Sequence, residues 1–144
     1  LNIYNQNNYN NNCVNCIVAY DLRQRGFDVT ARSIKECDLR LKADQAWEGV
    51  KKQTVSENVF DEVNRVMNKW GENSRAFIGI EGKETSHAVV AIVQNQKLKL
   101  IDPQRNREYN SIESIKELLG DKVTFWRIDT LEVSQTGYNS CKSR

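Results

Sequence analysis

The sequence predicts an α+β domain in which an N-terminal helix packs on a small antiparallel sheet. Two runs of alternating apolar residues, 86–93 and 97–102, are typical of paired strands. Residues 13–25 and 59–70 instead place apolar side chains at the spacing of a helix face. A chain of 144 residues has the size of one domain and can bury a core without disulfides or metals.

The first helix is predicted over residues 12–26. Its apolar residues repeat every four positions, at Val14, Val18 and Leu22. Asn11 and Asn12 are typical N-cap residues, and Gly26 is a typical stop after the last turn. Cys13 is therefore expected in the first turn of this helix.

The remaining elements follow in chain order from the same kinds of signal. They are a short extended segment at 27–31, an irregular or partly helical stretch at 33–53, a helix capped by Ser56 and ended by Gly71, a strand at 76–80, a loop at 81–85, a helix at 112–119 with Asn110 and Glu113 as a capping box, and a strand at 122–128. The asparagine-rich residues 1–11 predict a connector, and the polar residues 134–144 predict a frayed tail.

The two alternating runs predict a hairpin that turns near Asn95 and Gln96. This hairpin places His87, at the start of its first strand, within about one residue of Asp102, at the end of its second. Pro103 follows at once and ends the strand, because proline cannot donate to a ladder. A carboxylate beside an imidazole fixes the ring's tautomer and stabilises the imidazolium, as a general base requires.

Cys13 is the candidate nucleophile for such a pair. Free backbone N–H groups and the positive end of the dipole at a helix start favour the thiolate over the thiol. The same N–H groups can receive the oxyanion that forms on an attacked carbonyl or carboxamide. These residues together predict a Cys-His-Asp constellation that carries out thiol chemistry on an amide.

Three blocks of sequence carry a family resemblance. The first runs from Asn12 to Ala31, the second is Ser86-His87-Ala88-Val89, and the third is Ile101-Asp102-Pro103-Gln104. Together they resemble the papain-fold toxin domains of bacterial polymorphic toxin systems. Such domains also occur at the ends of some phage head-morphogenesis proteins, and their relatives include glutamine-deamidase effectors. The resemblance extends to the strand near Ile128.

The resemblance implies a papain-like cysteine hydrolase fold, with a catalytic domain at 12–133. It also implies a triad that carries over residue by residue. Cys13 would be the nucleophile, His87 the general base and acid, and Asp102 the residue that orients the imidazole.

Two assignments within this resemblance have alternatives. The Cys-x-x-Cys pair is also similar to the papain-type peptidase signature, in which the second cysteine, here Cys16, is the nucleophile. That signature has a nearby upstream glutamine and an aromatic residue after the second cysteine, whereas here Gln6 is too far back and Ile17 follows, so Cys13 is preferred. Gln104 could support the imidazole, orient the substrate or serve only as a turn residue.

The resemblance favours a bacterial toxin or effector that deamidates glutamine side chains of a target protein. A papain-like peptidase and a non-catalytic interaction module with the same fold are the alternatives. The resemblance further implies a domain at the C-terminus of a larger secreted protein. It would be delivered into a target cell, act in the target cytoplasm and be neutralised by a cognate immunity protein.

Composition argues against several other classes of protein. The net charge is only +2 with acids and bases mixed, so no nucleic-acid partner is indicated. No apolar run has the length of a bilayer span, and no cofactor is expected. A thiol–disulfide oxidoreductase would need a hydrophobic strand before Cys13-x-x-Cys16, where asparagines stand instead. A zinc site that adds Cys37 and His87 to this pair lacks a second knuckle.

Overall fold

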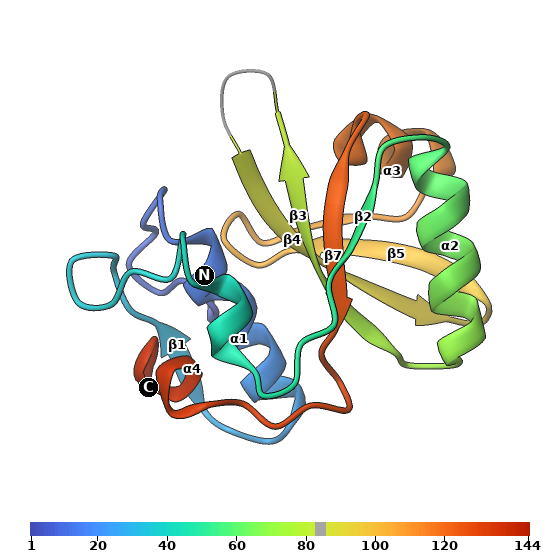
Figure 1. Ribbon diagram of the computed structural model, residues 1–144. Helices are drawn as coiled ribbons and strands as arrows, with labels where there is room; N and C mark the ends of the chain where they lie inside the picture. The colour runs from blue at the N-terminus through green and yellow to red at the C-terminus, as the bar shows by residue number, and fades with distance from the viewer. Residues whose placement is uncertain (83–85) are drawn as a thin grey trace.

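An antiparallel sheet separates two groups of helices in the computed structural model, which describes residues 1–82 and 86–144 (Figure 1). The helical elements are α1 (Cys13–Gln24), the 3₁₀ helix η1 (Ala43–Ala46), α2 (Val59–Trp70), α3 (Ile112–Leu119) and α4 (Gln135–Asn139). The strands are β1 (Val29–Ala31), β2 (Gln53–Val55), β3 (Arg75–Glu81), β4 (Ser86–Gln94), β5 (Lys97–Asp102), β6 (Arg107–Tyr109), β7 (Val123–Arg127) and β8 (Cys141–Ser143). These elements confirm the predicted α+β class.

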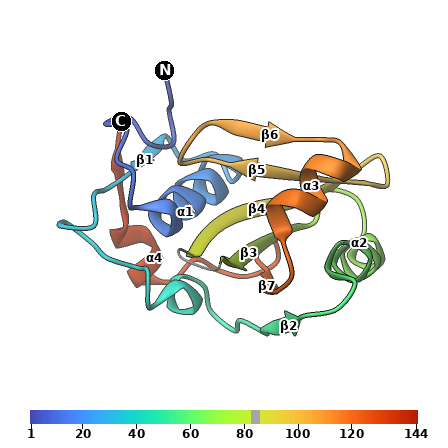
Figure 2. The same ribbon diagram turned by 90° about the horizontal axis from the view of Figure 1, so that it is seen from above.

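The larger sheet has six strands in the order β2-β7-β3-β4-β5-β6, and each neighbouring pair is antiparallel. Helix α1 lies on one side of it, and α2 and α3 lie on the other (Figure 2). A separate hydrophobic cluster fills each side of the sheet. The α1 cluster contains the stacked rings of Phe77 and Trp126, whose centroids are 4.3 Å apart, with Trp47 against both.

The predicted hairpin is formed by β4 and β5. Asn95 and Gln96 both adopt positive φ, at 54° and 65°, which is typical of the two-residue turn whose twist matches that of paired strands. This turn sets a register that pairs Val90 with Ile101. Strand β3 pairs with β4, so β3, β4 and β5 form a three-strand antiparallel meander. Part of the loop expected at 81–85 lies outside the described residues.

The C-terminal residues 134–144 are ordered, in contrast to the frayed tail expected from their polarity. They form α4 and β8, and β8 pairs with β1 through Ala31 and Cys141. A close contact holds α4 in place, since a Cβ on Gly137 would lie 2.4 Å from the carbonyl oxygen of Ala46. The order comes from partners more than 90 residues away in the chain, and local composition carries no signal for such partners.

The helix starts also differ from the predicted caps. Ser111, rather than Asn110, caps α3 by accepting from the N–H of Ser114. Asn58, in the left-handed conformation, precedes α2 in place of Ser56. Asn12 does occupy the N-cap position of α1, but its side chain makes no capping bond.

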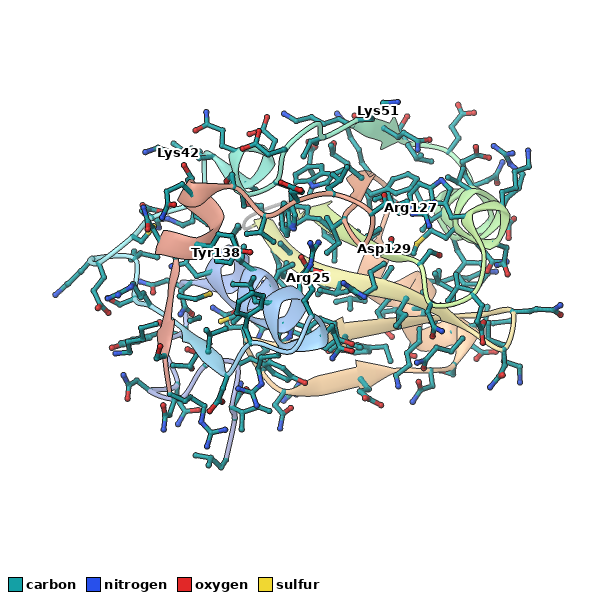
Figure 3. The ribbon with its side chains drawn as sticks, turned by 90° about the horizontal axis from the view of Figure 1, so that it is seen from below. Arg25, Lys42, Lys51, Arg127, Asp129 and Tyr138 are labelled. Carbon is teal, nitrogen blue, oxygen red and sulfur yellow. The ribbon has the colours of Figure 1, made fainter. Side chains whose placement is uncertain are left out.

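The end of β7 is tied to β3 by one carboxylate, which Figure 3 shows beside its arginine partner. Asp129 pairs with Arg127 through two bonds of 3.0 and 3.1 Å and also accepts from the N–H of Arg75 at 2.9 Å. Among the helices of the described residues, none combines the length and the apolar character that a membrane span requires.

Candidate active site

His87 and Asp102 meet at the open end of the hairpin as predicted, but the register sets them two residues apart rather than about one. The ladder between β4 and β5 ends at Val90 and Ile101, and His87 is paired on its other side with Ile80 of β3. Asp102 is therefore a diagonal neighbour of His87 across the opening. The Nε2 atom of His87 lies 2.7 Å from Oδ2 of Asp102.

The carboxylate of Asp102 is fully buried and has partners for both oxygens. Its Oδ1 accepts from the N–H of Arg105 at 3.2 Å, while Oδ2 faces His87. Burial alone would raise the pKa of this carboxyl, but the hydrogen bond and charge of His87, together with Arg105, hold it below its ordinary value of 3.8. Asp102 is thus a fixed, ionised partner for the imidazole.

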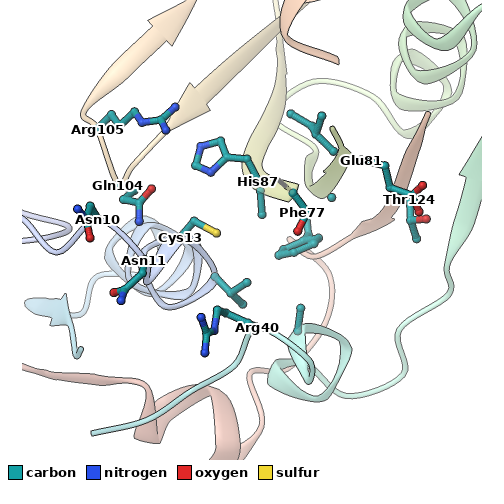
Figure 4. A pocket seen from close by; sticks show the side chains of 16 residues that line it. Asn10, Asn11, Cys13, Arg40, Phe77, Glu81, His87, Gln104, Arg105 and Thr124 are labelled. Carbon is teal, nitrogen blue, oxygen red and sulfur yellow. The ribbon is translucent and has the colours of Figure 1, made fainter. Parts of the chain in front are cut away.

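Cys13 is the first residue of α1 and is partly exposed. Its thiol lies near the imidazole of His87, whose pKa it helps to raise, and both side chains line one open cleft of about 740 Å³ (Figure 4). Because Asp102 occupies Nε2, the ring atom left for Cys13 is Nδ1. The structure therefore brings the three predicted residues together in the order thiol, imidazole, carboxylate.

The ionisation of His87 is set by these two neighbours. Burial alone would lower the pKa of the imidazole, but the hydrogen bond and charge of Asp102, together with the neighbouring Cys13, raise it from 6.5 to about 9. The ring is therefore an imidazolium at neutral pH, which is the form that can stabilise a thiolate and protonate a leaving group.

A titration can test this ionisation directly, since His87 is the only histidine in the chain. The imidazole C–H resonance should titrate with a midpoint near 9 in the wild type and should fall toward 6.5 in Asp102→Asn. The same shift stabilises the fold, by an amount that is complete below pH 6.5 and is lost as the pH rises through about 9. A wild-type midpoint near 6.5 would contradict the geometry.

Cys16 does not reach the cleft. It has no exposed surface, and its thiol donates to Oδ1 of Asn12 at 3.4 Å. Burial, with smaller effects from Cys13 and Cys141, raises the pKa of the Cys16 thiol far above its ordinary value. A neutral, enclosed thiol is a packing group, so the geometry favours Cys13 over Cys16 as nucleophile.

Gln104 lies at the start of α1, beside Cys13 (Figure 4). One end of its buried carboxamide faces three backbone N–H groups, and an oxygen at that end accepts from Asn11 and Asn12 at 3.1 Å each and from Cys13 at 3.3 Å. Oδ1 of Asn12, which is an acceptor, also lies 3.5 Å from this end of the carboxamide. The three N–H donors nevertheless favour the orientation in which the oxygen faces them. Gln104 therefore supplies the cap that Asn12 does not.

This contact corrects one expectation from the sequence. The N–H groups at the helix start were expected to be free for an oxyanion, yet that of Cys13 already donates to Gln104. These contacts give Gln104 a role that the sequence did not suggest, which is to support the helix start. The sequence Asp-Pro-Gln is only a turn signal, so it could not indicate that the Gln104 side chain contacts the start of α1.

The rest of the cleft is built from residues that no sequence motif indicated. Phe77 and Gly79 of β3, Thr124 of β7 and Arg40 contribute to its walls. A Cβ on Gly79 would lie 3.4 Å from the carbonyl oxygen of Thr124. Because glycine has no side chain, nothing projects into the cleft at this position of its wall. These residues come from separate stretches of the chain, and only the fold brings them together.

All four cysteines are free thiols. Within residues 1–82 and 86–144, no group of three His, Cys, Asp or Glu side chains is placed to hold a metal ion.

A model of one protein family matches residues 11–107, about two thirds of the chain. The family is described as papain fold toxin 1, glutamine deamidase. The chain belongs to this family. The matched range begins two residues before Cys13 and includes His87, Asp102 and Gln104. A search of curated proteins finds no match.

Membership in the papain fold toxin 1 family confirms the resemblance and the papain-like fold that the sequence predicts. It also assigns the chain a general function, that of a toxin of the glutamine-deamidase type.

Proposed function

We propose that this protein deamidates glutamine side chains of a target protein through a triad of Cys13, His87 and Asp102. One observation carries the proposal: the imidazole of His87 lies between the Cys13 thiol and the Asp102 carboxylate at an open cleft. The family's description as a glutamine deamidase supports the choice of substrate.

The first step forms a thioester. The Cys13 thiolate attacks the side-chain carbonyl carbon of glutamine, and the carbonyl oxygen becomes an oxyanion. As this intermediate collapses, Nδ1 of His87 gives its proton to the departing nitrogen, which leaves as ammonia. Asp102 keeps the ring oriented through Nε2 during the transfer.

The second step releases glutamate and restores the enzyme. Neutral His87 takes a proton from water, and the hydroxide attacks the thioester carbon. The C–S bond breaks and the Cys13 thiolate returns with the imidazolium beside it. The net reaction consumes one water and converts the carboxamide to a carboxylate.

Gln104 also has a proposed role in the first step. Since the backbone N–H groups hold its oxygen, the NH₂ end of its carboxamide is the part left to donate a hydrogen bond. Gln104 lines the cleft beside Cys13. We assign this NH₂ group to the oxyanion, in place of the backbone N–H group that the sequence suggested.

The biological setting follows from the family. We propose that the domain reaches its target cell as the C-terminal part of a larger secreted protein and acts in the cytoplasm there. A cognate immunity protein would bind the domain and protect the producing cell. The family's description as a glutamine-deamidase toxin supports a protein substrate, and the open cleft of about 740 Å³ has room for a glutamine side chain.

Peptide mass spectrometry of target-cell proteins tests the reaction. Incubation with the wild-type domain should add about one dalton to specific glutamines, as replacing NH₂ by OH requires. Incubation with Cys13→Ser should leave the same peptides unmodified. New protein termini without modified glutamines would identify a peptidase instead. If neither modified glutamines nor new termini exceed the Cys13→Ser background, the result would favour a non-catalytic interaction module.

A further inference from the structure

The asparagine-rich start of the chain is part of the folded domain, although its sequence predicted a connector. The carbonyl of Tyr4 accepts from the N–H of Ala31 at 2.8 Å, and the N–H of Gln6 donates to Thr30 at 3.1 Å. Asn5 has no exposed surface. This segment is therefore fixed beside β1, and Figure 2 shows it passing the turn between β5 and β6.

Two asparagines of this segment hold the backbone that follows Asp102. The side-chain NH₂ of Asn2 donates to the carbonyls of Pro103 at 2.8 Å and Gln104 at 2.9 Å. The NH₂ of Asn5 donates to the same Gln104 carbonyl at 3.2 Å and to Tyr9 at 2.6 Å. The loop that carries Gln104 is thus anchored from outside the hairpin.

The same network reaches the residue before the nucleophile. Oδ1 of Asn5 accepts from the side chain of Asn12 at 3.2 Å, and Asn12 also donates to the carbonyl of Arg32 at 2.9 Å. Asn5 therefore touches both sides of the site: the backbone of Gln104 and the side chain next to Cys13. A buried amide with its donors and acceptor paired fixes geometry, because leaving any of them unpaired is costly.

We propose that Asn5 is a positioning residue for the reaction, which sets the placement of Cys13 relative to His87 and Asp102. The inference rests on the proposed role of Cys13. The thiol and the imidazole come from residues 74 positions apart in the chain, on α1 and β4, so their distance depends on how the helix start is held against the hairpin. A misplacement of the reacting groups by about 1 Å can lower the rate about 100-fold. Loss of the buried amide that joins the Gln104 backbone to the Asn12 side chain is therefore expected to lower the rate strongly.

The test compares Asn5→Ala with Asn7→Ala, a matched control in the same segment whose side chain is exposed and donates to the Tyr9 hydroxyl. Two rates are measured in folded protein: ammonia release from target-cell proteins, and alkylation of Cys13 by iodoacetamide across the pH range. Asn5→Ala should lower ammonia release by about 10- to 100-fold. Its alkylation at neutral pH should fall about tenfold, because the thiol would no longer be held beside the imidazole of His87.

Asn7→Ala should match the wild type in both rates. Equal pH profiles of alkylation in Asn5→Ala and the wild type would overturn the inference, even if Asn5→Ala were less stable to urea. This outcome is separate from the proposed function, which fails if the wild type itself releases no ammonia. Should Asn5→Ala not fold, Asn2→Ala decides the question, because Asn2 is only partly buried and donates to the same Gln104 carbonyl.

Discussion

Cys13→Ser is expected to lower amide hydrolysis by about 10⁴-fold or more, because removal of a nucleophile leaves only binding and oxyanion contacts. Cys16→Ser, a matched change one turn along the same helix, should keep most of the wild-type activity. Its hydroxyl can still donate to Asn12, which the thiol does at 3.4 Å, and it never meets the substrate. Initial rates of ammonia release measure both effects.

The two variants also distinguish the proposed triad from the papain-type peptidase signature and from a redox protein. Loss of activity in Cys16→Ser with activity retained in Cys13→Ser would support the papain-type peptidase signature and contradict the proposed triad. Equal loss in both, with a disulfide between them in the oxidised wild type, would support a redox protein. Urea unfolding of both variants is the control, since a folded Cys13→Ser protein is needed for the comparison.

The core of the site could be predicted because each part of it has a strong local signal. The hairpin register follows from strand alternation and a two-residue turn, so His87 and Asp102 meet for reasons contained in one short stretch. Cys13 follows from the helix start. That the helix start would face the hairpin needed either the fold or the family resemblance, because no local signal links residue 13 to residue 87.

The parts that the sequence did not predict depend on contacts over long sequence separation. Gln104 caps a helix about 90 residues earlier, and Asn5 binds a loop about 100 residues later. Strand β8 has three residues and exists because β1 accepts it as a partner. Asparagine is a common residue of turns and connectors, so a tract of them carries no sign that one is fully buried.

A buried carboxylate in α1 is expected to have the largest effect on stability. Asp21 has no exposed surface and holds three partners: the guanidinium of Arg25 at 2.9 Å, that of Arg75, and the indole N–H of Trp47 at 2.9 Å. Figure 3 shows Arg25 beside α1. These contacts join the first helix to β3 and to the aromatic cluster on its side of the sheet.

Asp21→Ala should therefore lower the free energy of unfolding by about 3–5 kcal/mol, because two mostly buried guanidinium groups would lose their shared anion. A loss of this size is a large part of the total stability of a typical domain. Urea denaturation of the variant and the wild type measures it.

Asp28→Ala is the matched control, since Asp28 also pairs with two arginines, Arg23 at 2.9 Å and Arg144 at 3.9 Å, but is 71% exposed. Water screens these pairs, and removing them should cost far less. If the two variants lost similar stability, burial of the Asp21 cluster would not be what anchors α1. If Asp21→Ala alone were destabilised, the helix that presents Cys13 would depend on a charge cluster away from the cleft.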